Sequence, residues 1–108
     1  MQIILDQNKK LVELCGKYNV KQLFAFGSVV KNKLKTDSDL DFLVYFNENL
    51  QLLDYADNFF DFMYELEILF NRKIDLISGK AMKNPYFIEE VDKTKQLLYD
   101  NQHQKIAV

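Results

Sequence analysis

Two apolar segments of strand type, separated by a polar loop, constrain this sequence more than any other feature. The first segment ends at Gly27-Ser28, and the second begins at Asp39-Leu40-Asp41 after a gap of ten residues. Successive residues of a strand point to opposite faces, so Asp39 and Asp41 share one face while Leu40 points to the other. Two carboxylates roughly 7 Å apart on one strand face suit a divalent cation. Gly27 lets the backbone turn close to a ligand and Ser28 adds a hydroxyl and an N–H, groups that suit phosphate oxygens.

The same aspartates admit two plainer interpretations. Asp37, Asp39, Asp41 and Glu48 occupy positions 1, 3, 5 and 12 of an EF-hand calcium loop. Position 6 would be Phe42, where that loop needs glycine, and the segment that follows is a strand rather than a loop. A polar turn explains Asp37 but not Asp41, which lies inside an apolar strand and needs a cation or a partner to neutralise it. We therefore favour a binding site over a turn.

Hydrophobic periodicity predicts the order of the secondary-structure elements. It indicates an amphipathic helix stopped at Asn19, a strand over Val20 to Phe26, a strand through Phe42 to Phe46, a helix over Leu52 to Phe70, a strand over Lys73 to Ser78, and a helix that starts at Asn84-Pro85 and keeps its apolar period as far as Asp100. This order predicts an α/β (α+β) fold in which helices pack on a small mixed β-sheet.

Each predicted helix has an apolar stripe that we expect to be buried. The first carries Ile4, Leu11, Cys15 and Tyr18; the long one Leu52, Ala56, Phe59, Phe60, Met63, Leu66 and Phe70; the last Phe87, Val91, Thr94 and Leu98. The acidic residues of the long helix, Asp54, Asp57, Asp61 and Glu65, are expected to form a solvated face rather than a metal site. Cys15 is interpreted as a small core residue rather than a nucleophile.

Length and composition limit the function classes. A chain of 108 residues supports one domain, which we place at 1–100, with a frayed tail at 101–108 that contains the only histidine, His103. The composition is that of an ordinary soluble protein and indicates neither disorder nor a membrane span. Met1 to Leu5 is too short an apolar run for a signal peptide or anchor. With Cys15 as its only cysteine, the chain is expected in a reducing cytoplasm.

Charge argues against a broad nucleic-acid-binding face. The formal net charge is −2, which is opposite to that of most proteins that bind nucleic acids through their phosphates. A local basic patch at Lys31, Lys33 and Lys35 would favour a single nucleotide over a duplex.

The Gly-Ser pair followed at this distance by Asp-x-Asp resembles the signature of the minimal nucleotidyltransferases of the DNA polymerase β superfamily. The resemblance covers nearly the whole chain. It implies a metal-dependent nucleotidyltransferase in which Asp39 and Asp41 hold two Mg²⁺ ions. It also implies that Gly27 and Ser28 bind the β and γ phosphates of ATP, with help from Lys31.

Asp75 is the candidate for a third metal-binding carboxylate. In its predicted strand Ile74 and Leu76 point to one face, so Asp75 points to the other. A surface ion pair with Lys73 or Arg72 is the plain alternative. The resemblance places a third catalytic carboxylate on the strand after the long helix, where Asp75 is the only acidic residue.

The resemblance also suggests an acceptor. Stand-alone members of this kind are typically the antitoxin half of MNT/HEPN toxin-antitoxin pairs, in which they adenylylate a tyrosine of the HEPN ribonuclease and release pyrophosphate. Assembly with such a partner is a further expectation. Family members commonly carry Arg-x-Arg-Gly directly after Gly-Ser, whereas this chain has Val29-Val30-Lys31-Asn32. That departure leaves an alternative open, a non-catalytic binding module that neutralises its partner by contact alone.

Overall fold

The computed structural model describes residues 1–102, so His103 and most of the predicted tail lie outside the described residues. The helices are α1 (Gln2–Leu5), α2 (Asn8–Lys17), α3 (Leu52–Phe70) and α4 (Pro85–Thr94), and the strands are β1 (Val20–Phe26), β2 (Leu40–Phe46), β3 (Ile74–Ser78) and β4 (Gln96–Asp100). Two short 3₁₀ turns, η1 (Gly27–Val29) and η2 (Gly79–Ala81), follow β1 and β3.

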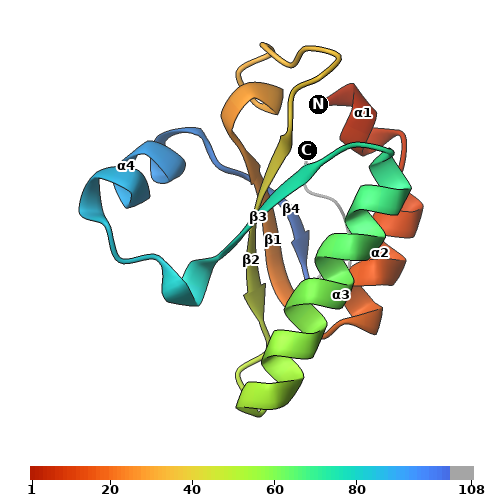
Figure 1. Cartoon of the computed structure of the whole chain (residues 1–108), viewed down its shortest axis with the longest axis vertical. Coiled ribbons are helices and arrows are strands. Elements are labelled where there is room, and N and C mark those ends of the chain that lie inside the picture. Colours follow the sequence, from red (N-terminus) through yellow and green to blue (C-terminus); the bar gives the residue numbers. More distant parts are fainter. Residues whose placement is uncertain (103–108) are drawn as a thin grey trace.

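The four strands form one mixed sheet in the order β3-β2-β1-β4. β2 and β3 run parallel, while β1 is antiparallel to both of its neighbours. Helices α2 and α3 cover one face of the sheet and α4 lies on the other side (Figure 1). The predicted α/β fold with a small mixed sheet is therefore confirmed.

Alternation along β2 separates a main core from a smaller one. Leu40, Phe42 and Val44 belong to the main core, which packs against α2 and α3. Leu43, on the opposite face, packs in a second cluster with Val91 of α4. Asp41 lies between Leu40 and Phe42 in sequence and so shares the α4 face of the sheet with Leu43. The predicted division of β2 into an apolar face and an aspartate face is confirmed.

The prediction that the last helix continues to Asp100 is wrong. α4 ends at Thr94, Lys95 takes an extended conformation (φ −59°, ψ 139°), and the next five residues form β4. β4 pairs antiparallel with β1, which would otherwise present an unpaired edge. Leu98 is fully buried, as expected, but from a strand rather than from a helical stripe. The pairing of β4 with a strand that is distant in the sequence leaves no signal in local periodicity.

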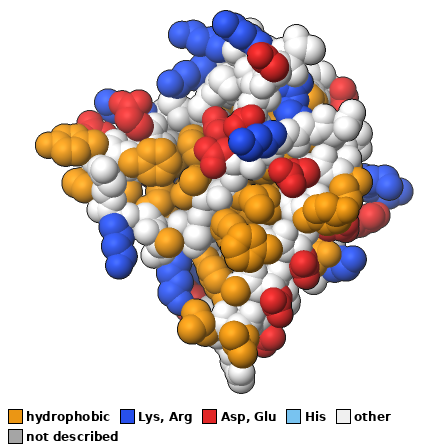
Figure 2. Space-filling view, viewed as in Figure 1, with side chains coloured by type: hydrophobic (Ala, Val, Ile, Leu, Met, Phe, Trp, Pro, Cys, Tyr) orange, Lys and Arg blue, Asp and Glu red, His pale blue; other side chains and the backbone are white. Residues whose placement is uncertain are grey.

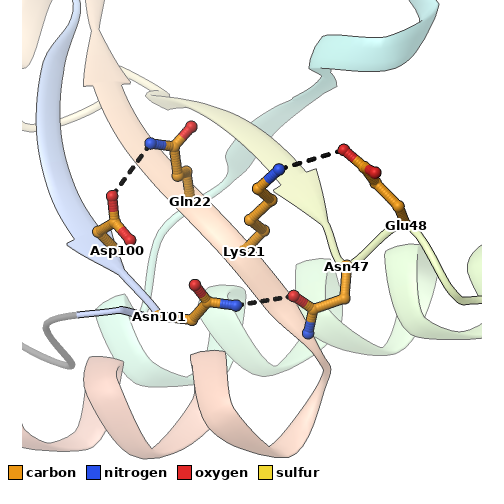
Figure 3. Close-up of polar contacts among 6 residues, drawn as sticks. All are labelled: Lys21, Gln22, Asn47, Glu48, Asp100 and Asn101. Carbon is orange, nitrogen blue, oxygen red and sulfur yellow. Dashed lines mark hydrogen bonds and ion pairs between the residues drawn. The ribbon is translucent and has the colours of Figure 1, made fainter.

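Polar side chains hold the end of β4 against β1 and β2 (Figure 3). The Gln22 amide donates to Asp100 at 3.1 Å, and the Asn101 amide donates to the Asn47 side-chain oxygen at 2.7 Å. The backbone N–H of Asn101 also donates to the carbonyl of Lys21 at 2.9 Å. These bonds join residues that are more than fifty positions apart in the chain.

The buried face of α3 differs from the predicted one. Phe62, Leu66 and Phe70 are its buried residues, whereas the predicted stripe omitted Phe62 and included Leu52 and Phe60. Leu52 is 81% exposed and Phe60 61% exposed. The predicted stripe was wrong at these positions because α3 is apolar around most of its circumference, so periodicity alone does not decide which face packs.

The first predicted helix is two helices. α1 ends at Leu5 and α2 begins at Asn8, so Ile4 belongs to a separate turn that packs into the main core. Asn19 ends the second helix in a left-handed conformation (φ 61°), as the sequence predicts for a stop. Cys15 is fully buried, and burial raises the pKa of its thiol. Its assignment to the core is confirmed.

Two phenylalanines of α3 give a matched test of its buried face. Phe62→Ala should lower the free energy of unfolding by about 3–5 kcal/mol, because it empties a fully buried site. Phe60→Ala, on the exposed face, should change it by less than about 1 kcal/mol. Urea unfolding followed by circular dichroism measures both. A larger loss for Phe60→Ala than for Phe62→Ala would contradict the orientation of α3.

Candidate active site

Two aspartates lie side by side on neighbouring parallel strands. Asp41 of β2 and Asp75 of β3 are partners in the strand register. Residues paired in this way point to the same face, here the face that carries α4. Ile74 and Leu76 point to the main core, so the predicted orientation of Asp75 is correct. Within residues 1–102 Asp75 makes no ion pair with Lys73 or Arg72, the plain alternative for its role.

The environment of Asp41 disfavours its charged form. Its pKa is raised from the usual 3.8 to about 6, first by burial and then by the charge of Asp75, a side-chain hydrogen bond with Asp75 and the charge of Asp39. Burial and like charges both penalise an ionised carboxyl group. The other two predicted carboxylates, Asp39 and Asp75, therefore both act on Asp41 at this point of the sheet.

Gly27 is fixed by its closeness to Asp41. Phe26, the last residue of β1, pairs with Asp41 across the antiparallel ladder. The next residue, Gly27, has φ +75°, a conformation that residues with a side chain rarely adopt. A Cβ atom at Gly27 would lie 2.3 Å from the carboxylate oxygen Oδ2 of Asp41. The turn after β1 and the aspartate of β2 are thus in direct contact, and no larger residue fits between them.

Asp39 stands at the end of an anchored loop. The Arg72 guanidinium donates to the carbonyl oxygens of Lys35 and Ser38, at 2.7 and 2.8 Å. The backbone N–H of Leu40 then donates to the carbonyl of Lys73 at 3.1 Å, which starts the pairing of β2 with β3. Arg72 thus positions the segment that enters β2. From the sequence, Arg72 is expected only as an ion-pair partner of Asp75. The one sequence signal for its anchoring role is its position just before the strand that carries Asp75.

Ser28 and Lys31 lie on the turn next to Asp41. Ser28 belongs to η1 and is partly exposed, and its hydroxyl makes no hydrogen bond within the described part of the chain. Lys31 is exposed and has no ion-pair partner among residues 1–102. The backbone N–H groups of Val30 and Lys31 both donate to the Gly27 carbonyl at 3.1 Å, which closes the turn. A hydroxyl and a cation on this turn therefore remain available to a ligand.

The carboxylates do not form a complete metal cage by themselves. Within residues 1–102, no three acidic, histidine or cysteine side chains surround one point closely enough to hold an ion. Asp41 and Asp75 form the close pair, with Asp39 as a neighbouring charge. Mg²⁺ is usually held by one or two carboxylates together with phosphate oxygens and water. The donor set therefore fits a cation that arrives with a nucleotide.

A separate cavity lies at the other end of β2. It has a volume of about 400 Å³, and its lining includes Lys21, Tyr45, Tyr55 and Lys80. Tyr45 is four residues beyond Asp41 in the same strand, so this cavity is distinct from the carboxylate pair. The aspartates themselves lie near the open edge of the sheet, because β3 is an edge strand.

Comparison with known proteins identifies the family of this chain. The family model described as polymerase beta, nucleotidyltransferase matches residues 9–104. The chain belongs to this family. Within the polymerase beta nucleotidyltransferases, it is 34% identical over 84 residues to the protein adenylyltransferase MntA of Thermococcus cleftensis, covering 78% of this chain and 79% of that protein.

Solved structures of nucleotidyltransferases share the fold. A candidate minimal nucleotidyltransferase superimposes with a TM-score of 0.69 at 28% identity, covering 88% of this chain and 92% of that one. A chain from the complex of a tri-AMPylated Shewanella oneidensis HEPN toxin with its MNT antitoxin has a TM-score of 0.60 at 15% identity, over 88% of this chain and 71% of that one. At that identity the second likeness concerns the fold alone. No helix in the described part of this chain combines the length and apolar character needed to cross a bilayer.

The raised pKa of Asp41 predicts a pH-dependent effect of Asp41→Asn. Because the folded pKa of about 6 lies above the unfolded value of 3.8, ionisation of Asp41 destabilises the fold. That cost is absent below about pH 4 and complete above about pH 6. In metal-free buffer the variant should gain stability relative to the native chain as pH rises through this window, by on the order of 1 kcal/mol after solvent screening.

Urea unfolding at about pH 4 and pH 7 measures this difference. Asp37→Asn, at an exposed position two residues before Asp39, is the matched control and should show no such gain. A variant whose stability relative to the native chain is the same at both pH values would contradict the raised pKa.

Proposed function

We propose that this chain is a metal-dependent protein adenylyltransferase, which transfers AMP from ATP to a hydroxyl group of a partner protein and releases pyrophosphate. The observation that carries the proposal is the pairing of Asp41 with Asp75 beside the Gly27 turn. Carboxylates placed next to an open turn suit a nucleotide held through a cation, because the turn can approach phosphate while the acids bind the ion. The adenylyl group is suggested by the name of the MntA relative.

The reaction divides the roles of the three acids. The acceptor oxygen forms a bond to the α-phosphorus of ATP as the bond from that phosphorus to the bridging oxygen breaks, and pyrophosphate leaves. Asp39 and Asp41 hold the metal-bound nucleotide, while Asp75, the most exposed of the three, faces the acceptor hydroxyl and favours loss of its proton. Ser28 and the backbone at Gly27 contact the β and γ phosphates, and Lys31 adds a positive charge.

A cation fits the electrostatics of this site. Burial, and then the neighbouring charges of Asp75 and Asp39, penalise the charged form of Asp41, so a divalent ion would relieve a repulsion that the fold already contains. Bound Mg²⁺ would neutralise the triphosphate and lower the pKa of the acceptor hydroxyl. Without a cation, these carboxylates would repel a triphosphate.

We propose a HEPN-type toxin as the protein acceptor, with the chain acting as its antitoxin and assembling with it. The support is the AMPylated HEPN toxin in the structurally similar complex, together with the sequence resemblance to stand-alone antitoxins. An enzyme that consumes ATP and carries one unpaired cysteine, Cys15, suits the cytoplasm.

A non-catalytic binding module is the second candidate. It is favoured by the loop after Ser28, where Lys31 supplies one cation in place of the arginines common in the family. Lysine offers a point charge without the bidentate fork of arginine, so the triphosphate is held less firmly. Such a module would bind the same partner without transferring AMP.

Incubation with α-labelled ATP, Mg²⁺ and the product of the adjacent gene separates the two candidates. We expect label on the partner protein, and none when excess chelator removes the metal. Calorimetric titration should likewise show that ATP binding weakens strongly in chelator. Tight ATP binding without metal would argue against the carboxylate site, and tight partner binding without label transfer would favour the module.

Asp75→Asn should separate transfer from nucleotide binding. Removing the carboxylate that faces the acceptor should lower the transfer rate at least about 100-fold, while Asp39 and Asp41 still hold metal-bound ATP with an affinity within about threefold of the native value. Asp37→Asn, the exposed control, should leave both unchanged. Transfer by Asp75→Asn at the native rate would remove Asp75 from the site.

A further inference from the structure

The outer face of α3 exposes a row of large apolar side chains. Leu53 is 80% exposed, Phe60 61%, Tyr64 64% and Ile68 59%. We call these four residues the outer stripe. Single exposed apolar residues are common on protein surfaces, but a contiguous row of this size usually marks an interaction site.

Helical geometry places the outer stripe opposite the core. Phe60, Tyr64 and Ile68 follow one another at intervals of four residues, and Leu53 precedes Phe60 by seven, so all four fall on one side of the helix. The buried residues of α3, which include Phe62, lie on the other side. The stripe runs from residue 53 to residue 68, a length of roughly 22 Å at 1.5 Å per residue. It is long enough to accept a partner helix of about four turns.

The charges that α3 itself carries are all negative. α3 contains Asp54, Asp57, Asp61, Glu65 and Glu67 and no lysine or arginine. Glu65 lies 4.0 Å from Lys17, but Asp54, Asp57 and Asp61 have no ion-pair partner among residues 1–102. In the space-filling view, hydrophobic side chains gather along α3 with acidic groups at their margin (Figure 2).

This charge pattern selects the occupant. A second copy of the chain, packed with its α3 against this one, would bring five acidic residues against five, with only Glu65 of each copy paired to a lysine, and like charges across an interface are unfavourable. An apolar helix flanked by lysine or arginine residues would instead complement both the stripe and the acids. The occupant is therefore a different protein with a basic margin.

The outer stripe and the carboxylates lie at the same edge of the sheet, on its two opposite sides. α3 packs on one face of the sheet, and Asp41 and Asp75 point to the other face. The body of α3 and the edge strand β3, which packs directly against it, lie between the outer stripe and the carboxylates. A protein seated on α3 and extending over the β3 edge can bring a hydroxyl group to Asp75.

We propose that the outer stripe of α3 and its acidic margin form the docking surface for the acceptor protein, which contacts it with an apolar helix flanked by basic residues. This inference rests on the proposed function, because it takes the protein that receives AMP as the occupant. It assigns to α3 a role in substrate binding that is separate from the chemistry at Asp75.

Calorimetric titration with the purified product of the adjacent gene tests this surface. Leu53→Ser and Phe60→Ser should each weaken binding about tenfold or more. Leu52→Ser is the matched control, because Leu52 is as exposed as Leu53 (81%) but lies about 100° away around the helix; its effect should stay within about twofold. Circular dichroism checks that each variant folds.

Charge reversal provides an independent arm. The double variant Asp57→Lys, Asp61→Lys should bind about tenfold more weakly, and its binding should depend less on salt. Asp6 is an exposed acid directly after α1, so the control Asp6→Lys should have little effect. Native affinity in both the apolar and the charge variants would overturn the proposal, as would a native chain that does not bind this protein. Light scattering that shows a homodimer for the native chain and a monomer for Phe60→Ser would also overturn the proposal, because the occupant would then be a second copy.

The outcome for docking is distinguishable from the outcome for catalysis. The label-transfer assay, run on the same variants, should show a raised KM for the protein acceptor with ATP affinity unchanged. Binding that depends on the outer stripe but gives no label transfer would sink the adenylyltransferase proposal and leave the docking surface standing. Label transfer by Phe60→Ser with a native KM for the protein acceptor would contradict the docking surface and leave the adenylyltransferase proposal intact.

Discussion

The close pairing of two like charges on neighbouring strands is the constraint around which this fold is arranged. Asp41 and Asp75 lie side by side, and burial, followed by the repulsion between them, keeps the pKa of Asp41 high. The apolar residues that alternate with them, among them Leu40, Phe42 and Ile74, are buried, and each contributes about 1.5–3 kcal/mol. The free energy gained from that burial outweighs the cost of ionising Asp41 in the folded state, which is on the order of 1 kcal/mol. The sheet therefore holds the acids together without a ligand.

Two further features keep this arrangement open to a nucleotide. Gly27 lets the turn and the Asp41 carboxylate lie in direct contact, because any Cβ there would strike the carboxylate. Arg72 ties the preceding loop to the end of α3 through two carbonyl oxygens. The loop is thereby fixed at the point where Asp39 enters β2, while Lys31 stays exposed. A site that stores electrostatic repulsion and leaves room for phosphate is suited to binding a cation and nucleotide together.

Local pattern predicted the elements well but not their pairing. The bounds of β1 and α3 match the predicted ones, because each is a long segment with strong hydrophobic signal and clear stops such as Asn19. β4 was missed, since a strand that pairs with residues 78 positions away looks like the end of a helix when read locally. The orientation of Asp75 followed from alternation alone, yet its position next to Asp41 depends on parallel register, which only tertiary structure decides. The contact of Gly27 with Asp41 and the anchoring by Arg72 are of the same long-range kind.

The error in the buried face of α3 has a physical origin that bears on function. A surface helix normally pairs one apolar face with one polar face, so that its period identifies the core. α3 has apolar residues on both sides, Phe62 inward and Phe60 outward, and the period cannot choose between them. Exposed apolar rows are a liability for solubility and contribute nothing to the core. Exposed apolar residues that break the usual amphipathic pattern and add nothing to the core indicate a contact with another molecule. The outer stripe of α3 fits this description.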